Sequence, residues 1–332
     1  MSQPTPRPVA PNDSLPPVEP PSAGFLVQLF LVPAIIVAII VCVWLAFHWL
    51  AHLGNDPQAY VRTLRRSNEG RWQAALNLAN DLRGPGGAAL KTDETLASEL
   101  GRILSDEVTS GRSGEQSETL RLYLCRALGE FAIPAAADPL ITQAERVADP
   151  QTSRAAVEAL AVLTTNLVAA GRAAEAPPGI VSAVVTASRS DDTSLRGAAA
   201  FTLGVVGGDE AVDRLVQLAA DDNDDVRYNA ALGLARQGRD EALDTLAEML
   251  TLEDIAPAPG SDDPAAQSQR YKRALVVINA LRGVAALVDA SSAPPPAMIL
   301  ERIEALQQDP VGDVRSSAAA LLKKIERLRT AA

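Results

Sequence analysis

Residues 221–234 read DDNDDVRYNAALGL, and this stretch decides the fold. The acidic residues and Asn223 supply an N-cap and complement the positive end of a helix dipole. Counted from Arg227, two alanines at +3 and +4 and a leucine at +7 fall on one face of that helix. Alanines let a neighbouring helix approach closely, and the leucine fills the groove between the two helices. The stretch therefore predicts a helix that packs tightly on another helix.

The pattern R-x-x-A-A-x-x-L recurs along the chain, which indicates an array of repeats. Copies without a mismatch begin at Arg71, Arg196, Arg227 and Arg315; degenerate copies begin at Arg121 and Arg273, and one shifted by a single residue lies near Arg154. After the copy at Arg196, two glycines at 207–208 end the helix and residues 209–218 begin a second one. Each unit is thus a helical hairpin, and the sequence predicts an all-α fold. We expect an α-solenoid of about seven hairpins over residues 54–332, with a loop insertion at 254–268.

The motif D-x-x-V-R-x-x-A-A-x-x-L, followed by Gly-Asp-Glu-Ala and a Leu-rich second helix, resembles HEAT repeats, specifically the short HEAT-like type of bilin lyases. The best stretch is 191–252, and a weaker match covers 68–331. The resemblance implies a structural ladder of Asp and Arg side chains, which falls here on Asp191, Arg196, Asp224 (or Asp225), Arg227, Asp313 and Arg315. The units around Arg121 and Arg273 lack a clean acidic partner. The resemblance also implies a scaffold that binds a partner protein.

A 23-residue apolar run at 25–47 contains Gln28 as its only strongly polar side chain. A helix of that length is about 35 Å long, which exceeds a hydrocarbon core of roughly 30 Å. A cleaved signal peptide is the alternative, but it would have a basic leader and an apolar core of about 7 to 15 residues. Here the leader is acidic and the core is longer. The sequence predicts a transmembrane helix and interface at 25–53, after a disordered Pro-rich tail at 1–24.

Basic residues beside the apolar run predict its orientation. Arg62, Arg65, Arg66 and Arg71 follow the run, whereas only Arg7 precedes it. The positive-inside rule therefore places the repeat domain in the cytoplasm; a domain on the extracytoplasmic side is the alternative. The abundance of Arg over Lys, and of Ala, suggests a bacterial source. We expect a single-pass protein of the plasma or inner membrane.

The inventory of nucleophiles and metal ligands argues against catalysis. The chain has two histidines, His48 and His52, at the end of the apolar run, and no carboxylate or thiolate ligand stands beside them. The repeat region lacks histidine, which removes Ser-His-Asp and Cys-His arrangements and most zinc sites. The two cysteines, Cys42 and Cys125, imply no disulfide framework.

The sequence also argues against nucleotide binding and nucleic-acid binding. Residues 84–92, GPGGAALKT, resemble a phosphate-binding loop, but Leu90 replaces the Gly required before the Lys, and a loop between helices is the simpler interpretation. The net charge of −11 repels nucleic acid. We expect no catalytic, cofactor-binding or metal-binding residues, no cofactor and no small-molecule substrate, but a partner protein. The alternative is an enzyme or enzyme accessory of the bilin-lyase-like HEAT type.

Overall fold

The computed structural model describes residues 23–52, 57–66, 70–252 and 264–331, and it divides the chain into two compact units, 1–55 and 56–332. The predicted Pro-rich tail lies outside the described residues, apart from its last two positions, which are helical.

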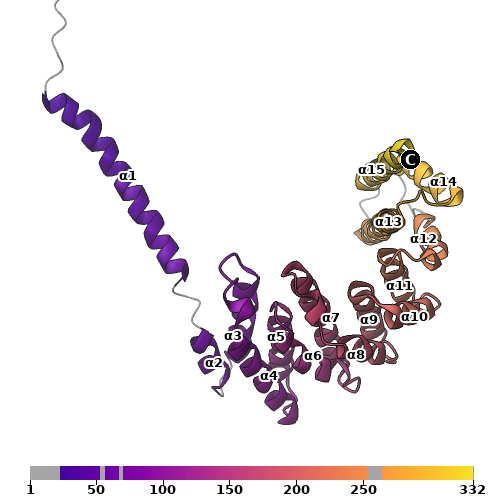
Figure 1. Ribbon diagram of the computed structural model, residues 1–332, viewed down its shortest axis with the longest axis horizontal. Coiled ribbons are helices and arrows are strands. Elements are labelled where there is room, and N and C mark those ends of the chain that lie inside the picture. The colour runs from indigo at the N-terminus through magenta and orange to yellow at the C-terminus, as the bar shows by residue number, and fades with distance from the viewer. Residues whose placement is uncertain (1–22, 53–56, 67–69, 253–263, 332) are drawn as a thin grey trace, which may run out of the picture. The chain divides into compact units, whose positions relative to one another are not determined.

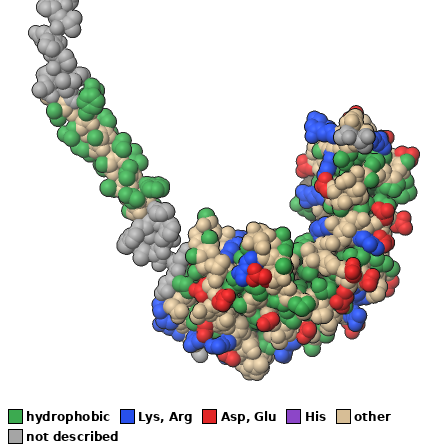
Figure 2. All heavy atoms as spheres, in the orientation of Figure 1, with side chains coloured by type: hydrophobic (Ala, Val, Ile, Leu, Met, Phe, Trp, Pro, Cys, Tyr) green, Lys and Arg blue, Asp and Glu red, His purple; other side chains and the backbone are tan. Residues whose placement is uncertain are grey.

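The first unit contains the helix α1 (Ala23–His52), which is 30 residues long. Its most apolar part, Val27–Phe47, has a mean hydropathy of 3.0 and no buried residue. Hydrophobic side chains cover the visible face of this helix (Figure 2). Such a helix is long and apolar enough to cross a membrane, as a membrane anchor or a signal sequence can.

The second unit, as far as it is described, consists of helices without strands. Its α-helices are α2 (Pro57–Leu64), α3 (Arg71–Arg83), α4 (Glu94–Thr109), α5 (Glu115–Gly129), α6 (Ala137–Ala144), α7 (Pro150–Ala169), α8 (Gly179–Ala187), α9 (Thr193–Val206), α10 (Asp209–Leu218), α11 (Asp224–Arg236), α12 (Leu243–Leu250), α13 (Pro264–Ser291), α14 (Ala297–Ala305) and α15 (Gly312–Ala331). Short 3₁₀ turns are η1 (Leu90–Thr92), η2 (Pro134–Ala136), η3 (Ala173–Glu175), η4 (Asp240–Ala242) and η5 (Leu306–Gln308).

These helices form two layers (Figure 1). From α3 to α15 each odd-numbered helix packs on the next odd-numbered helix, and each also packs on the even-numbered helix that precedes it. All seven arginines that mark the repeats lie in the odd layer, one in each of its helices. The predicted all-α solenoid is therefore confirmed.

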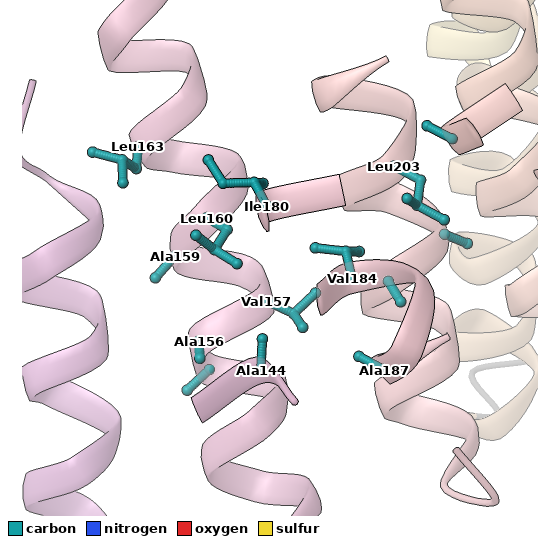
Figure 3. Close-up of a cluster of buried hydrophobic side chains, with 14 of the residues drawn as sticks. Ala144, Ala156, Val157, Ala159, Leu160, Leu163, Ile180, Val184, Ala187 and Leu203 are labelled. Carbon is teal, nitrogen blue, oxygen red and sulfur yellow. The ribbon is translucent and has the colours of Figure 1, made fainter. Parts of the chain in front are cut away.

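The repeat motif supplies the core between the layers. In α11, Ala230, Ala231 and Leu234 are completely buried, as are the corresponding Ala199, Ala200 and Leu203 of α9. Figure 3 shows the same kind of packing around α7, where small and branched side chains from α6, α7, α8 and α9 fill the space between helices. Small residues at +3 and +4 thus set the spacing of the array, as the sequence pattern indicates.

Glycines bring neighbouring odd helices still closer. A Cβ on Gly204 in α9 would lie 2.4 Å from the Cα of Gly233 in α11, and a Cβ on Gly129 in α5 would lie 2.9 Å from the Cα of Ala159 in α7. Both distances are shorter than a van der Waals contact between carbons. The backbones therefore touch at these two crossings.

One detail of the sequence expectations changes. Residues 264–268 of the expected loop insertion form the first turn of α13, where proline is well placed because its missing N–H has no helical partner. The rest of that segment, 254–263, lies outside the described residues. Cys42 and Cys125 are both free thiols, and Cys125 is fully buried in α5.

Candidate partner-binding surface

The arginine that opens each repeat joins two consecutive repeats. In α9, Arg196 donates from Nε and Nη2 to the two carboxylate oxygens of Asp221, at 2.9 and 3.1 Å. Its Nη1 donates to the backbone carbonyls of Ser190 and Asp191, both at 3.1 Å. The guanidinium is 19% exposed and the Asp221 carboxylate 12% exposed. The guanidinium thus makes a bidentate pair with Asp221 and two further hydrogen bonds to the backbone, which explains Arg196 as a structural residue.

Asp221 connects two consecutive repeats. Its carboxylate accepts from Arg196, while its backbone carbonyl accepts from Arg227 Nη1 at 3.1 Å. Asp309 does the same near the C-terminus, where its carboxylate lies 2.6 Å from Arg273 and its carbonyl 2.6 Å from Arg315. A single aspartate thus binds the arginine of the preceding repeat and that of its own repeat.

Three more ladder arginines pair with a carboxylate that lies further along the chain. The ion pairs are Arg71 with Glu107 at 2.7 Å, Arg121 with Asp149 at 2.8 Å and Arg227 with Glu248 at 2.9 Å. The units of Arg121 and Arg273, for which the sequence indicates no acidic partner, therefore have one.

The ladder is interrupted at α7. Among the described residues Arg154 pairs only with Glu158 of its own helix, at 3.5 Å, and both side chains are about half exposed. The position equivalent to the ladder arginine is Ser153, which is fully buried and donates to the Ala144 carbonyl at 2.7 Å. The one-residue shift of the motif in this repeat therefore replaces an ion pair with a short side-chain bond.

The six residues nominated from the sequence are only partly brought together. Asp224 and Arg227 form an ion pair of 2.8 Å within α11. Asp191 meets Arg196 through its backbone carbonyl rather than its carboxylate. Within the described part of the chain, the Asp313 carboxylate makes no ion pair with Arg315, because the arginine turns back to the carbonyls of Asp309 and Pro310.

Electrostatics agree with this geometry. The hydrogen bond from Arg196 lowers the pKa of Asp221, outweighing the opposing effect of burial. Burial is the largest influence on Glu107 and raises its pKa, but hydrogen bonds from Ser117 and Arg71 more than reverse the effect, so the net pKa is lowered. These carboxylates are held ionised, and they lack the raised pKa that a general acid needs.

The outer surface of the odd layer offers a different environment. Positions +2, +5 and +9 from the ladder position point away from the even layer, because the core takes +3, +4 and +7. From α7 to α13 these positions hold Ala155, Glu158, Val162, Ala198, Phe201, Val205, Asn229, Leu232, Arg236, Leu275, Ile278 and Arg282. We call this set the odd-layer face. It is mostly apolar, with one carboxylate in α7 and arginines at the C-terminal end of α11 and further along α13.

The repeat unit has three hollows, one of which lies on the odd-layer face. One depression of about 580 Å³ lies between α7, α9, α11 and α13, and its lining includes Phe201, Leu232 and Asn229. A second, of about 400 Å³, is lined by α3, α5 and α7 and includes Tyr123 and Arg126. A third, of about 700 Å³, lies around Arg71 and the loop before α5. Among the described residues no cluster of His, Cys, Asp or Glu is suited to hold a metal ion.

We compared the chain with curated proteins and with solved structures. No curated protein matches the chain. Similar solved structures include the Escherichia coli protein YibA, with 14% identity, 82% of this chain and 93% of that chain covered, and a TM-score of 0.45. Human deoxyhypusine hydroxylase has 19% identity, 82% and 96% coverage and a TM-score of 0.32. A designed armadillo repeat protein bound to the peptide (KR)4 has 16% identity, 81% and 98% coverage and a TM-score of 0.37.

One family model matches directly, that of HEAT repeats, and it covers residues 181–256. This range contains α9, α10, α11 and α12 together with the Arg196–Asp221–Arg227 part of the ladder. The chain is an α-solenoid, and its residues 181–256 match the model of HEAT repeats.

Proposed function

We propose that this protein is a membrane-anchored HEAT-repeat scaffold that holds a partner protein at the bilayer. The observation that carries the proposal is that one chain contains both an apolar helix without buried residues and a repeat unit with exposed apolar side chains on its odd layer. Exposed apolar surface on a repeat array is suited to extended protein contacts.

The anchor itself rests on length and hydropathy. Val27–Phe47 spans 21 residues, about 31 Å as a helix, which matches the hydrocarbon core of a bilayer. The basic residues that follow, Arg62, Arg65 and Arg66, favour a cytoplasmic repeat domain by the positive-inside rule. With a bacterial source, the location is the inner membrane.

Membrane extraction tests the anchor. We expect the wild-type chain to stay in the membrane pellet after washing with sodium carbonate at high pH. The double variant Ile39→Asp, Ile40→Asp should move to the supernatant, because each aspartate at the centre of a span opposes insertion by about 3 kcal/mol. Val216→Asp, on an exposed position of α10, is the matched control and should remain in the pellet. Intact mass tests the signal-sequence alternative, since a cleaved protein would lack α1.

Protease accessibility tests the side of the membrane. In right-side-out spheroplasts the repeat domain should be protected until the membrane is lysed. Digestion in intact spheroplasts would place the domain outside and reverse the orientation. Chemical crosslinking followed by mass spectrometry then tests partner binding, and reproducible crosslinks from residues of the odd-layer face to one other protein are the expected result. A chain that crosslinks to nothing under either condition would contradict the scaffold role.

A further inference from the structure

Two arginines on the outer surface of the odd layer lie against aromatic rings instead of carboxylates. The Arg126 guanidinium carbon is 5.4 Å from the centre of the Tyr123 ring, and that of Arg236 is 5.2 Å from the centre of the Phe201 ring. Both arginines are exposed. Within the described ranges neither has an ion pair or a hydrogen bond from its side chain, so each retains its full set of N–H donors for a ligand.

The absence of a carboxylate beside Arg236 is unexpected from composition. Residues 189–252, which surround it in the sequence, contain 13 acidic and only 6 basic residues. Four of the acidic residues lie at 221–225, at the start of α11, whereas Arg236 is the last residue of that helix. Eleven residues separate Asp225 from Arg236, about 16 Å along a helix. Within α11 itself the carboxylates lie at the first turn and Arg236 at the last, and the next carboxylates, Asp240 and Glu241, belong to η4.

A second arginine occupies the same register on the next odd helix. Arg236 stands nine residues after Arg227, and Arg282 stands nine residues after Arg273. The helices α11 and α13 pack on each other, with Leu232 against Gly283 and Gly238 against Ala290, so Arg236 lies further along the helix pair than Arg282. Arg282 makes one long hydrogen bond, 3.4 Å from its Nη1 to Asn279 Oδ1, and no ion pair within the described residues. The odd layer thus presents two arginines on neighbouring helices that the described part of the protein leaves without an ion pair.

Apolar side chains are exposed on the same layer of helices. Val162 is 39% exposed, Phe201 39% and Leu275 42%, each from a different odd helix. Phe201 lines the 580 Å³ hollow and also carries the Arg236 guanidinium over its ring. Burial lowers the pKa of Arg236, which means that its charge is partly removed from water and would gain from a carboxylate brought to it.

We propose that the odd-layer face from α7 to α13 binds an acidic segment of a partner protein, whose carboxylates pair with Arg236 and Arg282 while a large apolar side chain packs beside Phe201. This assignment rests on the proposed scaffold function and names the chemistry of the partner. Carboxylates match the two guanidinium forks, and the exposed apolar residues give the segment an anchor. Nucleic acid is the less suitable polyanion, because a long phosphate backbone carries more negative charge than a short acidic segment and is repelled more strongly by the acidic residues at 221–225 and the net charge of −11.

The test uses the full chain in lipid nanodiscs and fluorescence anisotropy of synthetic peptides. The probe is a fluorescein-labelled twelve-residue peptide of Glu, Leu and Phe, compared with versions in which Gln or Lys replaces every Glu. We expect the Glu peptide to bind most tightly, and its affinity to fall with rising salt because the contacts are partly exposed. The double variant Arg236→Gln, Arg282→Gln should bind about tenfold more weakly, from two pairs of moderate strength.

Two further variants separate charge from fold and from apolar contact. Arg189→Gln, just after the end of α8 in the even layer, removes the same charge from an exposed position and should leave the affinity within about twofold of wild type. Phe201→Ala should weaken the Glu and Gln peptides by a similar factor, since both carry the apolar anchor. Circular dichroism confirms that each variant keeps the helical signal and melting midpoint of the wild type.

Several outcomes would overturn the assignment. Equal affinities for the Glu and Gln peptides would show that charge plays no part, and tighter binding of the Lys peptide would reverse the sign. Competition by a 15-base single-stranded DNA at lower concentration than the Glu peptide would make the face a nucleic-acid surface. Absence of peptide binding would also refute it. The scaffold function is measured separately: partner crosslinks that map to the even layer would leave that function standing and sink this inference alone.

Discussion

The glycines of α9 provide a prediction in which two effects of opposite sign compete. Gly197 and Gly204 lie seven residues apart in the same helix. Replacing either with alanine should favour the helix by roughly 1 kcal/mol, because glycine loses more backbone freedom on folding. What differs is the space into which the new methyl group must fit. The comparison therefore isolates packing from helix propensity.

At Gly204 the methyl carbon would lie 2.4 Å from the Cα of Gly233, a backbone atom of α11. Carbon atoms in contact are normally about 3.5 to 4.0 Å apart, so the two helices must separate by about 1 Å. Overpacking of a tight core costs about 1 to 3 kcal/mol, and the upper end applies because no side chain can move aside. At Gly197 the nearest atoms are Asn229 Nδ2 at 3.7 Å and Val226 Cγ2 at 3.9 Å, which are ordinary contacts.

We expect Gly204→Ala to destabilise the repeat unit by about 2 kcal/mol net and Gly197→Ala to stabilise it by about 0.5 to 1 kcal/mol. For a unit of this size the melting midpoint should fall by about 5 °C in the first variant and rise by about 2 °C in the second. The assay is circular dichroism of the full chain in detergent, with midpoints compared directly because repeat arrays need not unfold in two states. Equal midpoints for the two variants would refute the close approach of α9 and α11.

Three further predictions concern the ladder and the buried thiol. Arg196→Gln should lower the unfolding free energy by about 1 to 3 kcal/mol, while Arg154→Gln, which breaks an exposed pair, should change it by less than about 0.5 kcal/mol; urea unfolding compares the two. Because the pKa of Asp221 is lowered in the folded state, its contribution is fully present above the unfolded value of about 4 and is lost as the pH falls through the folded value. The stability difference between wild type and Asp221→Asn should therefore be constant above about pH 4 and shrink below it, and a constant difference down to pH 2 would contradict the ladder. Burial raises the pKa of Cys125 to about 12, so in a Cys42→Ser background mass spectrometry should find no iodoacetamide adduct at pH 8 until urea is added.

The features of the fold that can be predicted from the sequence are clearest at α11. Its acidic start, its arginine and the alanines that follow locate the helix, its buried face and the layer to which it belongs. The same motif locates all seven odd helices, because it combines an N-terminal cap with burial at +3, +4 and +7, and both are local properties. The fold class is therefore readable from the chain.

The ladder is less readable, because four aspartates crowd into 221–225 and any of them can cap a helix. Side-chain direction decides among them: Asn223 takes the cap, and Asp221 turns toward Arg196 of the preceding repeat. A signal was nevertheless present, since Asp221 and Asp309 each stand six residues before the next ladder arginine. That spacing places the carboxylate outside the helix, in the turn where the previous repeat's arginine can reach it.

The odd-layer face is the part that no local pattern predicts. Arg196, Arg236 and Arg282 look alike in the sequence, yet the first is engaged on all sides and the other two are not. Only the arrangement of neighbouring helices separates a structural arginine from an available one, because the partner carboxylate comes from another repeat or not at all.

The anchor and the face have to be considered together for the proposed function to be effective. Two partly exposed arginine pairs and one apolar contact amount to modest affinity, because exposed ion pairs contribute about 0.2 to 1 kcal/mol each. If the anchor confines the repeat unit to the bilayer, a partner held in the same membrane meets it at an effective concentration of the order of millimolar, as for linked binding modules. Weak contacts then suffice for high occupancy, and they remain reversible. On this reasoning, release from the membrane should reduce occupancy of the partner more than the loss of either arginine. The tether raises the effective concentration for the whole interface, whereas each arginine contributes a single ion pair.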